Sequence, residues 1–460
     1  MIKPTIFREY DIRGIADEDL VSENVILLGK GIGTFLTRTG AETLVIGRDV
    51  RLSSRRIRDA LIEGLISTGV NVIDVGVTLT PIQYFGIIHF DADGGVMITG
   101  SHNPIEYNGL KISQKGVAPV YGEQIQGIKR IVEESDYETG RGEVLPMEIF
   151  PDYIAMIKSK LKFNKKLKVA VDAGNGTAGL LMPELWQEMG CEVADIYCEP
   201  DGRFPNHLPD PTVAKYVVDL QKKVLEVGAD IGIGYDGDSD RIGVIDDTGR
   251  ILFADRLIAI LSREVLDRHP GGEIVFDVKC SQALSEEIEK YGGKPLMWKT
   301  GHSLLKAKMK ESGSPLAGEM SGHIFYADDF FGFDDAIYVS GRLLQILSNT
   351  DKKMSELADE IPHFESTPEI RIETTDEDKF KVVSELAAHF QKEYETIDID
   401  GARVLFGDGW GLVRASNTQP VLVLRFEAKT KERLLEIIEI FKAKLSNYPS
   451  VTFSDADFEV

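Results

Sequence analysis

Val169-Ala170-Val171-Asp172-Ala173-Gly174 is an apolar run that ends in an aspartate-bearing turn, and two other segments share this design. They are Val45-Ile46-Gly47-Arg48-Asp49 and Ile274-Val275-Phe276-Asp277-Val278-Lys279. Each predicts a short β-strand. Each is followed, roughly 40 to 65 residues later, by a second strand-like run that leads into a polar loop, which leaves room for a crossover helix. The pattern therefore predicts three related α/β domains.

The polar loops that follow these repeats begin near Thr99, Asp236 and Gly318. Ligands bind at the carboxyl ends of parallel strands in such sheets, so we expect the functional site where the three loops meet. Domain boundaries are predicted near residues 147, 250 and 365, which gives domains over 1–147, 148–250, 251–365 and 366–460.

The last domain has a different pattern and is predicted to be a smaller α+β domain. We expect a strand over 369–373 and a helix over 375–394 with Phe380, Val383, Ala387 and Phe390 on its apolar face. Two strands over 411–416 and 421–428 follow, and an amphipathic helix spans about 431–445. The predicted fold class is therefore α/β, with three mixed α/β domains and a C-terminal α+β domain around a central cleft.

Composition and charge narrow the classes of partner. The chain has 52 Lys and Arg against 75 Asp and Glu, a formal charge of −23, which disfavours binding to nucleic acid. A phosphorylated ligand would need a few local basic residues against this background. No apolar run is long enough to span a membrane, the N-terminal residues are charged, and the three cysteines form no CxxC pair. We expect a soluble cytoplasmic protein with buried thiols, and a monomer is compatible with the sequence.

The stretch Gly232-Ile233-Gly234-Tyr235-Asp236-Gly237-Asp238-Ser239-Asp240-Arg241 is a strand that leads into three carboxylates at alternate positions. Three hard oxygen ligands on one side of a tight loop suit Mg²⁺, which keeps positions open for a phosphate oxygen. A solvated acidic turn is the alternative, but three like charges repel one another unless a cation offsets them. An EF-hand is disfavoured because Arg241 stands where that loop has glycine and no helix precedes it.

A second motif, Thr99-Gly100-Ser101-His102-Asn103-Pro104, follows an apolar run and is followed closely by Lys111. Ser101 can accept a phosphoryl group, Gly100 allows close backbone approach, and Lys111 can donate to a phosphate or to a reacting oxygen. Taken alone, the segment is equally consistent with an ordinary Ser/Asn/Pro turn. A serine hydrolase is disfavoured because the flanks do not form Gly-x-Ser-x-Gly.

Two further motifs carry polar side chains suited to binding. The candidates for contacts with sugar hydroxyls are Glu319, Ser321 and His323. The candidates for holding a phosphate monoester, at the tip of the predicted C-terminal hairpin, are Arg414, Ser416, Asn417 and Thr418.

Taken in order, these four motifs resemble those of the α-D-phosphohexomutase superfamily along the whole chain, and look most similar to its bacterial phosphomannomutase/phosphoglucomutase branch. Residues 99–104 are similar to that family's phosphoserine loop, 236–241 to its metal loop, 318–323 to its sugar loop and 414–418 to its phosphate loop. The resemblance also places six residues along the active cleft, namely Tyr10, Arg13, Lys111, Arg241, Lys279 and His302.

The resemblance implies reversible phosphoryl transfer between C1 and C6 of mannose and glucose phosphates. Phosphorylated Ser101 would give its phosphoryl group to the free hydroxyl, forming a hexose 1,6-bisphosphate that turns around and returns its other phosphate. Mg²⁺ would be held by Ser101, Asp236, Asp238 and Asp240. Catalytic roles are implied for Ser101, Lys111, Arg13, Arg241 and His302.

Three alternatives are weighed against this interpretation. A phosphoglucosamine mutase is the nearest, although such relatives usually carry Gln at the position of Met320. An aspartyl-phosphate phosphatase could use Asp236, but the Thr or Val expected two residues after the second aspartate is missing. A non-catalytic phosphosugar-binding protein would not need both Ser101 and the three aspartates.

Overall fold

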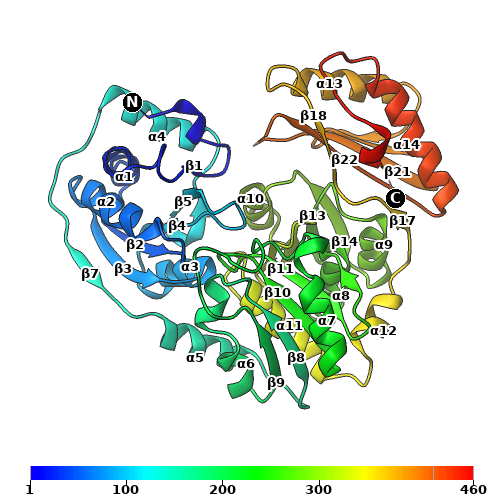
Figure 1. The fold of residues 1–460 in the computed structure, drawn as a ribbon, viewed down its shortest axis with the longest axis horizontal. Helices are drawn as coiled ribbons and strands as arrows, with labels where there is room; N and C mark the ends of the chain where they lie inside the picture. The colour runs from blue at the N-terminus through cyan, green and yellow to red at the C-terminus, as the bar shows by residue number, and fades with distance from the viewer. Residues whose placement is uncertain (1, 418, 459–460) are drawn as a thin grey trace.

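The computed structural model describes residues 2–417 and 419–458. Its four domains follow one another along an arc, with the first and the fourth at the two ends (Figure 1). The predicted fold class is confirmed, because three sheets with helices on their faces precede a smaller C-terminal α+β domain. None of the helices within the described residues is both long enough and apolar enough to cross a lipid bilayer.

The first three domains are each built on one sheet. The strands of the first are β1 (Ile12–Ile15), β2 (Thr43–Arg48), β3 (Asn71–Val77), β4 (Gly94–Ile98), β5 (Tyr107–Gln114), β6 (Ala118–Pro119) and β7 (Val144–Pro146). Those of the second are β8 (Lys168–Asp172), β9 (Glu192–Ile196), β10 (Ile231–Tyr235), β11 (Ile242–Asp246) and β12 (Ile251–Leu252). Those of the third are β13 (Glu273–Asp277), β14 (Lys294–Trp298), β15 (Leu316–Gly318) and β16 (Ile324–Tyr326).

The same strand order recurs in all three sheets, as β5-β4-β2-β3, β11-β10-β8-β9 and β16-β15-β13-β14. Three strands of each set are parallel, and the fourth returns antiparallel beside the last of them. The three similar sequence segments form the central strands β2, β8 and β13. The polar loops therefore leave the carboxyl ends of β4, β10 and β15, which are equivalent places in the three domains.

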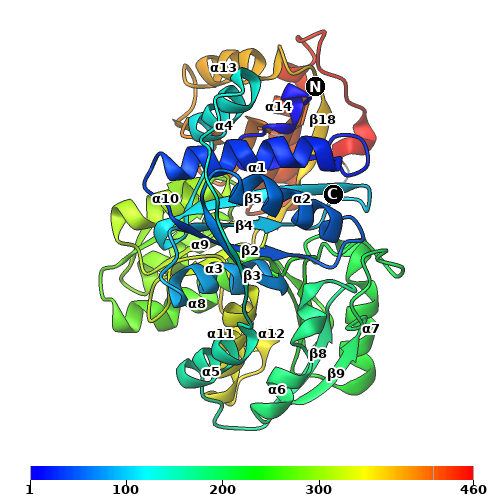
Figure 2. The ribbon, with the colours of Figure 1, turned by 90° about the vertical axis from the view of Figure 1, so that its left-hand side faces the viewer.

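The helices cover both faces of these sheets. They are α1 (Ser22–Thr37), α2 (Ser54–Ile66), α3 (Thr80–His89), α4 (Glu123–Glu134), α5 (Phe150–Lys160), α6 (Glu184–Glu188), α7 (Val218–Val227), α8 (Ala254–Arg268), α9 (Gln282–Lys290), α10 (His302–Ser312), α11 (Ala336–Ser348) and α12 (Met354–Asp359). Figure 2 shows α1 and α2 lying over the first sheet, where they close a separate apolar core. The opposite face joins a core that continues through the next two domains and includes Ile82, Val171 and Ile258. The first three domains are thus packed as one body.

The C-terminal domain has its own core. Its elements are β17 (Glu365–Ser366), β18 (Ile370–Glu373), α13 (Lys379–Phe390), β19 (Thr396–Ile397), β20 (Ala402–Leu405), β21 (Gly409–Ala415), β22 (Val421–Ala428) and α14 (Lys431–Leu445). It is attached to the third domain through Arg403, which donates to the carbonyls of Val278 and Cys280 at 2.7 Å each. The guanidinium also stacks over Trp410 at 3.7 Å. This contact fixes the hairpin β21–β22 relative to the end of β13.

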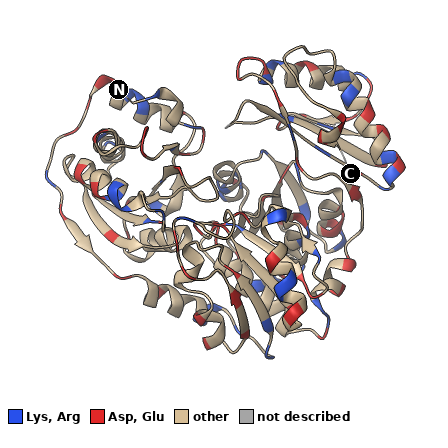
Figure 3. Ribbon diagram, in the orientation of Figure 1, with Lys and Arg blue, Asp and Glu red and all other residues tan. Residues whose placement is uncertain are grey.

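Two expectations about side-chain burial are wrong. Phe380 lies in the first turn of α13 and is 57% exposed, because the buried face of that helix is rotated to include Val382 and Leu386. Cys198 is only partly buried, whereas Cys191 and Cys280 are buried free thiols as predicted. Charged residues of both signs are spread over the outer helices, as on α14 (Figure 3).

Candidate active site

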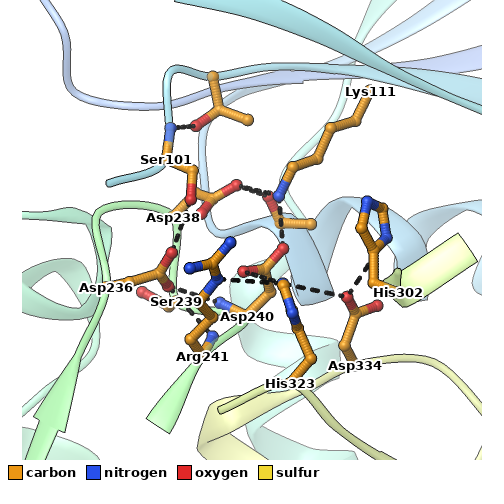
Figure 4. Close-up of polar contacts among 12 residues, drawn as sticks. Ser101, Lys111, Asp236, Asp238, Ser239, Asp240, Arg241, His302, His323 and Asp334 are labelled. Atoms are coloured by element: carbon orange, nitrogen blue, oxygen red, sulfur yellow. Dashed lines mark hydrogen bonds and ion pairs between the residues drawn. The ribbon is translucent and has the colours of Figure 1, made fainter. Parts of the chain in front are cut away.

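The loops that leave β4, β10 and β15 converge, and their polar side chains point toward one another (Figure 4). The first two loops touch through their backbones, since a side chain on Gly237 would place its Cβ 2.4 Å from the carbonyl oxygen of Ser101. Glycine is required there to let the loops approach. The predicted meeting point of the three loops is thus present in the structure.

Ser101 lies at the tip of the first loop and is buried. Its backbone has φ of +47°, a left-handed conformation that few residues other than glycine adopt. Its N–H donates to Thr99 Oγ1 at 2.8 Å, and its hydroxyl donates to Asp236 Oδ2 at 2.7 Å. The ring of His102 lies 3.1 Å from the same hydroxyl. Burial, together with the charges of Arg241 and Arg13, holds the pKa of His102 well below its ordinary value, so this ring is neutral.

The three aspartates of the second loop are at most 1% exposed. Asp236 Oδ1 accepts the backbone N–H groups of Asp240 and Arg241 at 3.1 Å each. Burial and the neighbouring carboxylates raise the pKa of Asp236 well above its ordinary value. The cost of charging this cluster is therefore high unless a cation is present.

Lys111 supplies one such cation. Its ammonium donates to Asp238 Oδ2 at 2.7 Å and also to Asp240. Burial opposes the charge on Lys111, but the carboxylates of Asp238 and Asp240 raise its pKa well above the ordinary value. Asp238 Oδ2 also accepts from Thr80 Oγ1 at 2.6 Å.

The aspartate triad fits a metal ion. One carboxylate oxygen from each residue lies within 4.8 Å of the others, and Asp238 Oδ1 is buried without a hydrogen-bond partner. Hard oxygen donors of this kind suit a divalent cation such as Mg²⁺. Asp240, His323 and Asp334 also place ligand atoms within 4.8 Å of one another, so Asp240 belongs to both groups of possible metal ligands.

The third loop sets His323 between two acidic groups. Its Nδ1 lies 2.8 Å from Glu319 Oε2, and its Nε2 lies 3.3 Å from Asp240 Oδ1. Burial disfavours the imidazolium, yet these carboxylates raise the pKa of His323 to about 9. Because a protonated ring donates from both nitrogens, Arg241 Nε, 3.3 Å from Nε2, is a neighbouring cation rather than a donor to that ring. Ser321 Oγ donates to Glu319 Oε2 at 3.0 Å.

His302 begins α10 beside this group. Its Nδ1 is buried without a hydrogen-bond partner and lies 4.0 Å from Asp334 Oδ2, which is also unpartnered. Asp334 Oδ1 accepts from Lys306 at 3.0 Å. Burial and the charges of Lys306 and His323 hold the pKa of His302 well below its ordinary value. A neutral imidazole is thus presented to the site.

The remaining predicted residues lie around this cluster. Arg13 Nη1 donates to the carbonyl of Gly100 at 3.0 Å, next to Ser101. Lys279 pairs with Glu369 Oε2 at 3.0 Å, at the boundary between the third and fourth domains.

Tyr10 joins three domains. Its hydroxyl donates to the carbonyl of Thr300 at 3.1 Å and accepts from Asn417 Nδ2 at 2.7 Å. On the same side, Arg414 Nε donates to Asp400 Oδ2 at 2.8 Å. Ser416 Oγ accepts the backbone N–H of Gln419 at 3.2 Å. Thr418 lies outside the described residues.

Sequence reasoning missed several residues at the site. Thr80 and Asp334 come from segments that carry no motif of their own, and only the fold brings them to the aspartates. Asp49 and Arg51 anchor the Ser101 loop. Asp49 belongs to one of the three repeated strand ends, a signal that could have pointed to it.

Comparison with known proteins identifies four family models in order along the chain. They are the phosphoglucomutase/phosphomannomutase alpha/beta/alpha domains I (residues 4–139), II (151–249) and III (253–364), and the C-terminal domain (369–444). The chain is 48% identical to a phosphomannomutase/phosphoglucomutase of Pseudomonas putida, over 96% of this chain and 95% of that one. It is 41% identical to a phosphoglucomutase of Neisseria meningitidis, over 97% and 98%. A crystal structure of a phosphoglucomutase/phosphomannomutase family protein from Burkholderia thailandensis, 40% identical, matches with a TM-score of 0.92, covering 97% of this chain and 98% of that one.

Proposed function

The chain belongs to the phosphoglucomutase/phosphomannomutase family, and we propose that it transfers a phosphoryl group between the C1 and C6 oxygens of hexose phosphates through phosphorylated Ser101. The observation that carries the proposal is the 2.7 Å hydrogen bond from Ser101 Oγ to Asp236, within a buried triad of aspartates. A phosphate on this oxygen would lie against the carboxylates. Such an arrangement is stable only with cations around it.

The charges at the site support this role. Lys111, Arg241 and protonated His323 offset part of the negative charge of the triad, since His323 also pairs with Glu319. Phosphorylation adds close to two negative charges, which one divalent cation would offset. We propose that Mg²⁺ is held by Asp236, Asp238, Asp240 and an oxygen on Ser101, where it would polarise the transferring phosphoryl group.

The protein's own groups then position the reactants. Lys111 lies against Asp238 and Asp240, and Arg13 donates to the residue before Ser101, so both can offset charge that develops on the phosphoryl oxygens. Arg241 approaches the same place from the second domain. His302, whose ring is neutral, can exchange a proton with the reacting sugar hydroxyl, while its buried Nδ1 faces Asp334 Oδ2.

Other residues would bind the parts of the sugar that do not react. Glu319, Ser321 and His323 would bind the hydroxyls, and Tyr10, Lys279, Arg414, Ser416 and Asn417 would bind the distant phosphate. In this scheme Ser101 gives its phosphoryl group to the free C1 or C6 oxygen, and the hexose 1,6-bisphosphate turns around. The other phosphate returns to Ser101, so that bonds formed and broken balance over one cycle.

We propose mannose and glucose phosphates as substrates, because Glu319 and Ser321 can contact hydroxyls away from C2, where these sugars differ. Phosphoglucosamine is the second candidate. The acidic balance of the chain supports small hexose phosphates as partners rather than nucleic acid.

A coupled assay with glucose 1-phosphate, Mg²⁺ and a trace of glucose 1,6-bisphosphate tests the proposal. Wild-type protein should form glucose 6-phosphate, and Ser101→Ala should lose this activity while unfolding at the same temperature as the wild type. Full turnover by Ser101→Ala would refute the phosphoserine mechanism.

A further inference from the structure

Arg51 lies in the loop between β2 and α2, and its guanidinium is buried beneath the loop that carries Ser101. Nη2 donates to the carbonyls of Ser101 at 2.8 Å and Asn103 at 2.5 Å. Nη1 donates to those of Pro104 at 2.7 Å and Tyr107 at 3.1 Å. One side chain thus satisfies three backbone carbonyls of the irregular loop and that of Tyr107, the first residue of β5. Buried carbonyls without such partners would destabilise this conformation.

Asp49 holds the same loop from the amide side. Its Oδ2 accepts the N–H of Gly100 at 3.0 Å, and its Oδ1 accepts the N–H of Arg51 at 2.9 Å and Ser54 Oγ at 2.5 Å. A side chain at position 100 would place its Cβ 2.3 Å from Arg51 Nε, so glycine and guanidinium fit together. Between them, Asp49 and Arg51 hold the backbone on both sides of Ser101.

Arg51 also contacts the second domain, which carries Asp236. The ring of Phe204 covers the guanidinium at 5.1 Å, and a Cβ on Gly202 would lie 2.3 Å from the carbonyl of Val50. The support beneath Ser101 is therefore shared with the domain that supplies the carboxylate partner of its hydroxyl.

We propose that Arg51, held by Asp49, is a positioning residue that fixes Ser101 Oγ against Asp236 for phosphoryl transfer. The inference rests on the proposed function of Ser101. The loop needs this support because Ser101 has a positive φ that a serine adopts only when its surroundings impose it. Arginine is required because the two terminal nitrogens of its planar guanidinium each donate to two carbonyls, whereas lysine has a single donor nitrogen.

The test measures single-turnover transfer of ³²P from labelled glucose 1,6-bisphosphate to Ser101, together with steady-state kcat and KM for glucose 1-phosphate. Arg51→Met should slow transfer by about 100-fold or more, the effect of a misplacement near 1 Å, and should leave KM within about threefold. Arg51→Lys should give an intermediate rate. The matched control is Arg56→Met, because Arg56 is half-buried on the adjoining helix and donates to the carbonyls of Leu20 and Ala16 at 2.7 and 2.9 Å.

Thermal unfolding separates positioning from folding. We expect Arg51→Met and Arg56→Met to lower the unfolding temperature by similar amounts, with only the first losing transfer. If Arg51→Met does not fold, Asp49→Asn serves instead, because its single amide oxygen cannot accept from Gly100 N–H and from Arg51 N–H at the same time. This variant should slow transfer with KM unchanged. Transfer rates of Arg51→Lys and Asp49→Asn within about threefold of Arg56→Met would overturn the inference. Wild-type protein that acquires no label at Ser101 would overturn the proposed function as well.

Discussion

Replacing Arg414 by alanine should weaken binding of 1-phosphate and 6-phosphate substrates equally. Arg414 is only 6% exposed, and its Nε is fixed by Asp400 Oδ2, which also accepts the N–H of Thr300 at 3.0 Å. The guanidinium is thus held in place at the meeting point of the third and fourth domains. We expect it to bind whichever phosphate is not reacting, so that one group serves both orientations of the bisphosphate.

The magnitude follows from the type of contact. A hydrogen bond to a charged group contributes about 1.5 to 3 kcal/mol, which corresponds to roughly 10- to 150-fold in affinity. The intermediate would also be held less tightly. Arg414→Ala should therefore release more 1,6-bisphosphate per turnover and depend more on added bisphosphate.

Steady-state kinetics in both directions, with released bisphosphate quantified, check this prediction. Arg433→Ala is the control, because Arg433, on α14 of the same domain, pairs with Asp408 and with Glu436. This control variant should bind the 1-phosphate and the 6-phosphate substrates as tightly as the wild type. Weaker binding of only the 1-phosphate or only the 6-phosphate substrate, or no rise in bisphosphate release, would contradict the role of Arg414.

Three further predictions concern the metal, the sugar and pH. EDTA should abolish turnover and Mg²⁺ restore it, and Asp238→Ala should behave like chelation in the coupled assay; undiminished activity in EDTA would remove the metal from the mechanism. Mannose 1-phosphate and glucose 1-phosphate should both be converted, and a preference beyond about a thousandfold in kcat/KM, roughly 4 kcal/mol, would show that C2 is contacted directly. Burial raises the pKa of Asp335 to about 7, although Tyr338 N–H and the Tyr153 hydroxyl donate to its carboxylate. In the folded protein Asp335 therefore keeps a proton that it loses in the unfolded chain. The stability that this proton contributes is lost as the pH rises through 7. In urea unfolding, the free energy of unfolding of Asp335→Asn should therefore rise by about 2 to 3 kcal/mol relative to that of the wild type between pH 5 and pH 8. If the difference in unfolding free energy between the two proteins is the same at both pH values, Asp335 does not titrate in this range.

The sequence predicted the repeated domains because a buried strand and its aspartate turn are local signals. Asp172 and Asp277 are the last residues of the central strands β8 and β13, and Asp49 directly follows the central strand β2. Asp49 and Asp277 make equivalent hydrogen bonds. Asp49 accepts the N–H of Gly100 in the loop after β4, and Asp277 accepts the N–H of Met320 in the loop after β15. Asp172 bonds instead to Gly174 N–H and to His207, which sequence spacing did not indicate.

What the sequence did not predict depends on contacts between distant segments. Thr80 reaches Asp238 from a different domain, and Asp334, which bridges to Phe325 of β16, lies 4.0 Å from the ring of His302. Phe380 was placed on the wrong face because its position in the first turn of α13 was not known. The domain boundaries at 147, 250 and 365 and the roles of the site residues stay predictions.

The central claim is that phosphate passes from Ser101 to the sugar, and transfer of label from isolated phosphoenzyme tests it most directly. Protein carrying ³²P on Ser101 should be mixed with unlabelled glucose 1-phosphate and Mg²⁺ and quenched within the first turnover. The account predicts that label leaves Ser101 at least as fast as the enzyme turns over and appears at C6 of the bisphosphate and of glucose 6-phosphate. Label that remains on Ser101 while product accumulates would contradict the account.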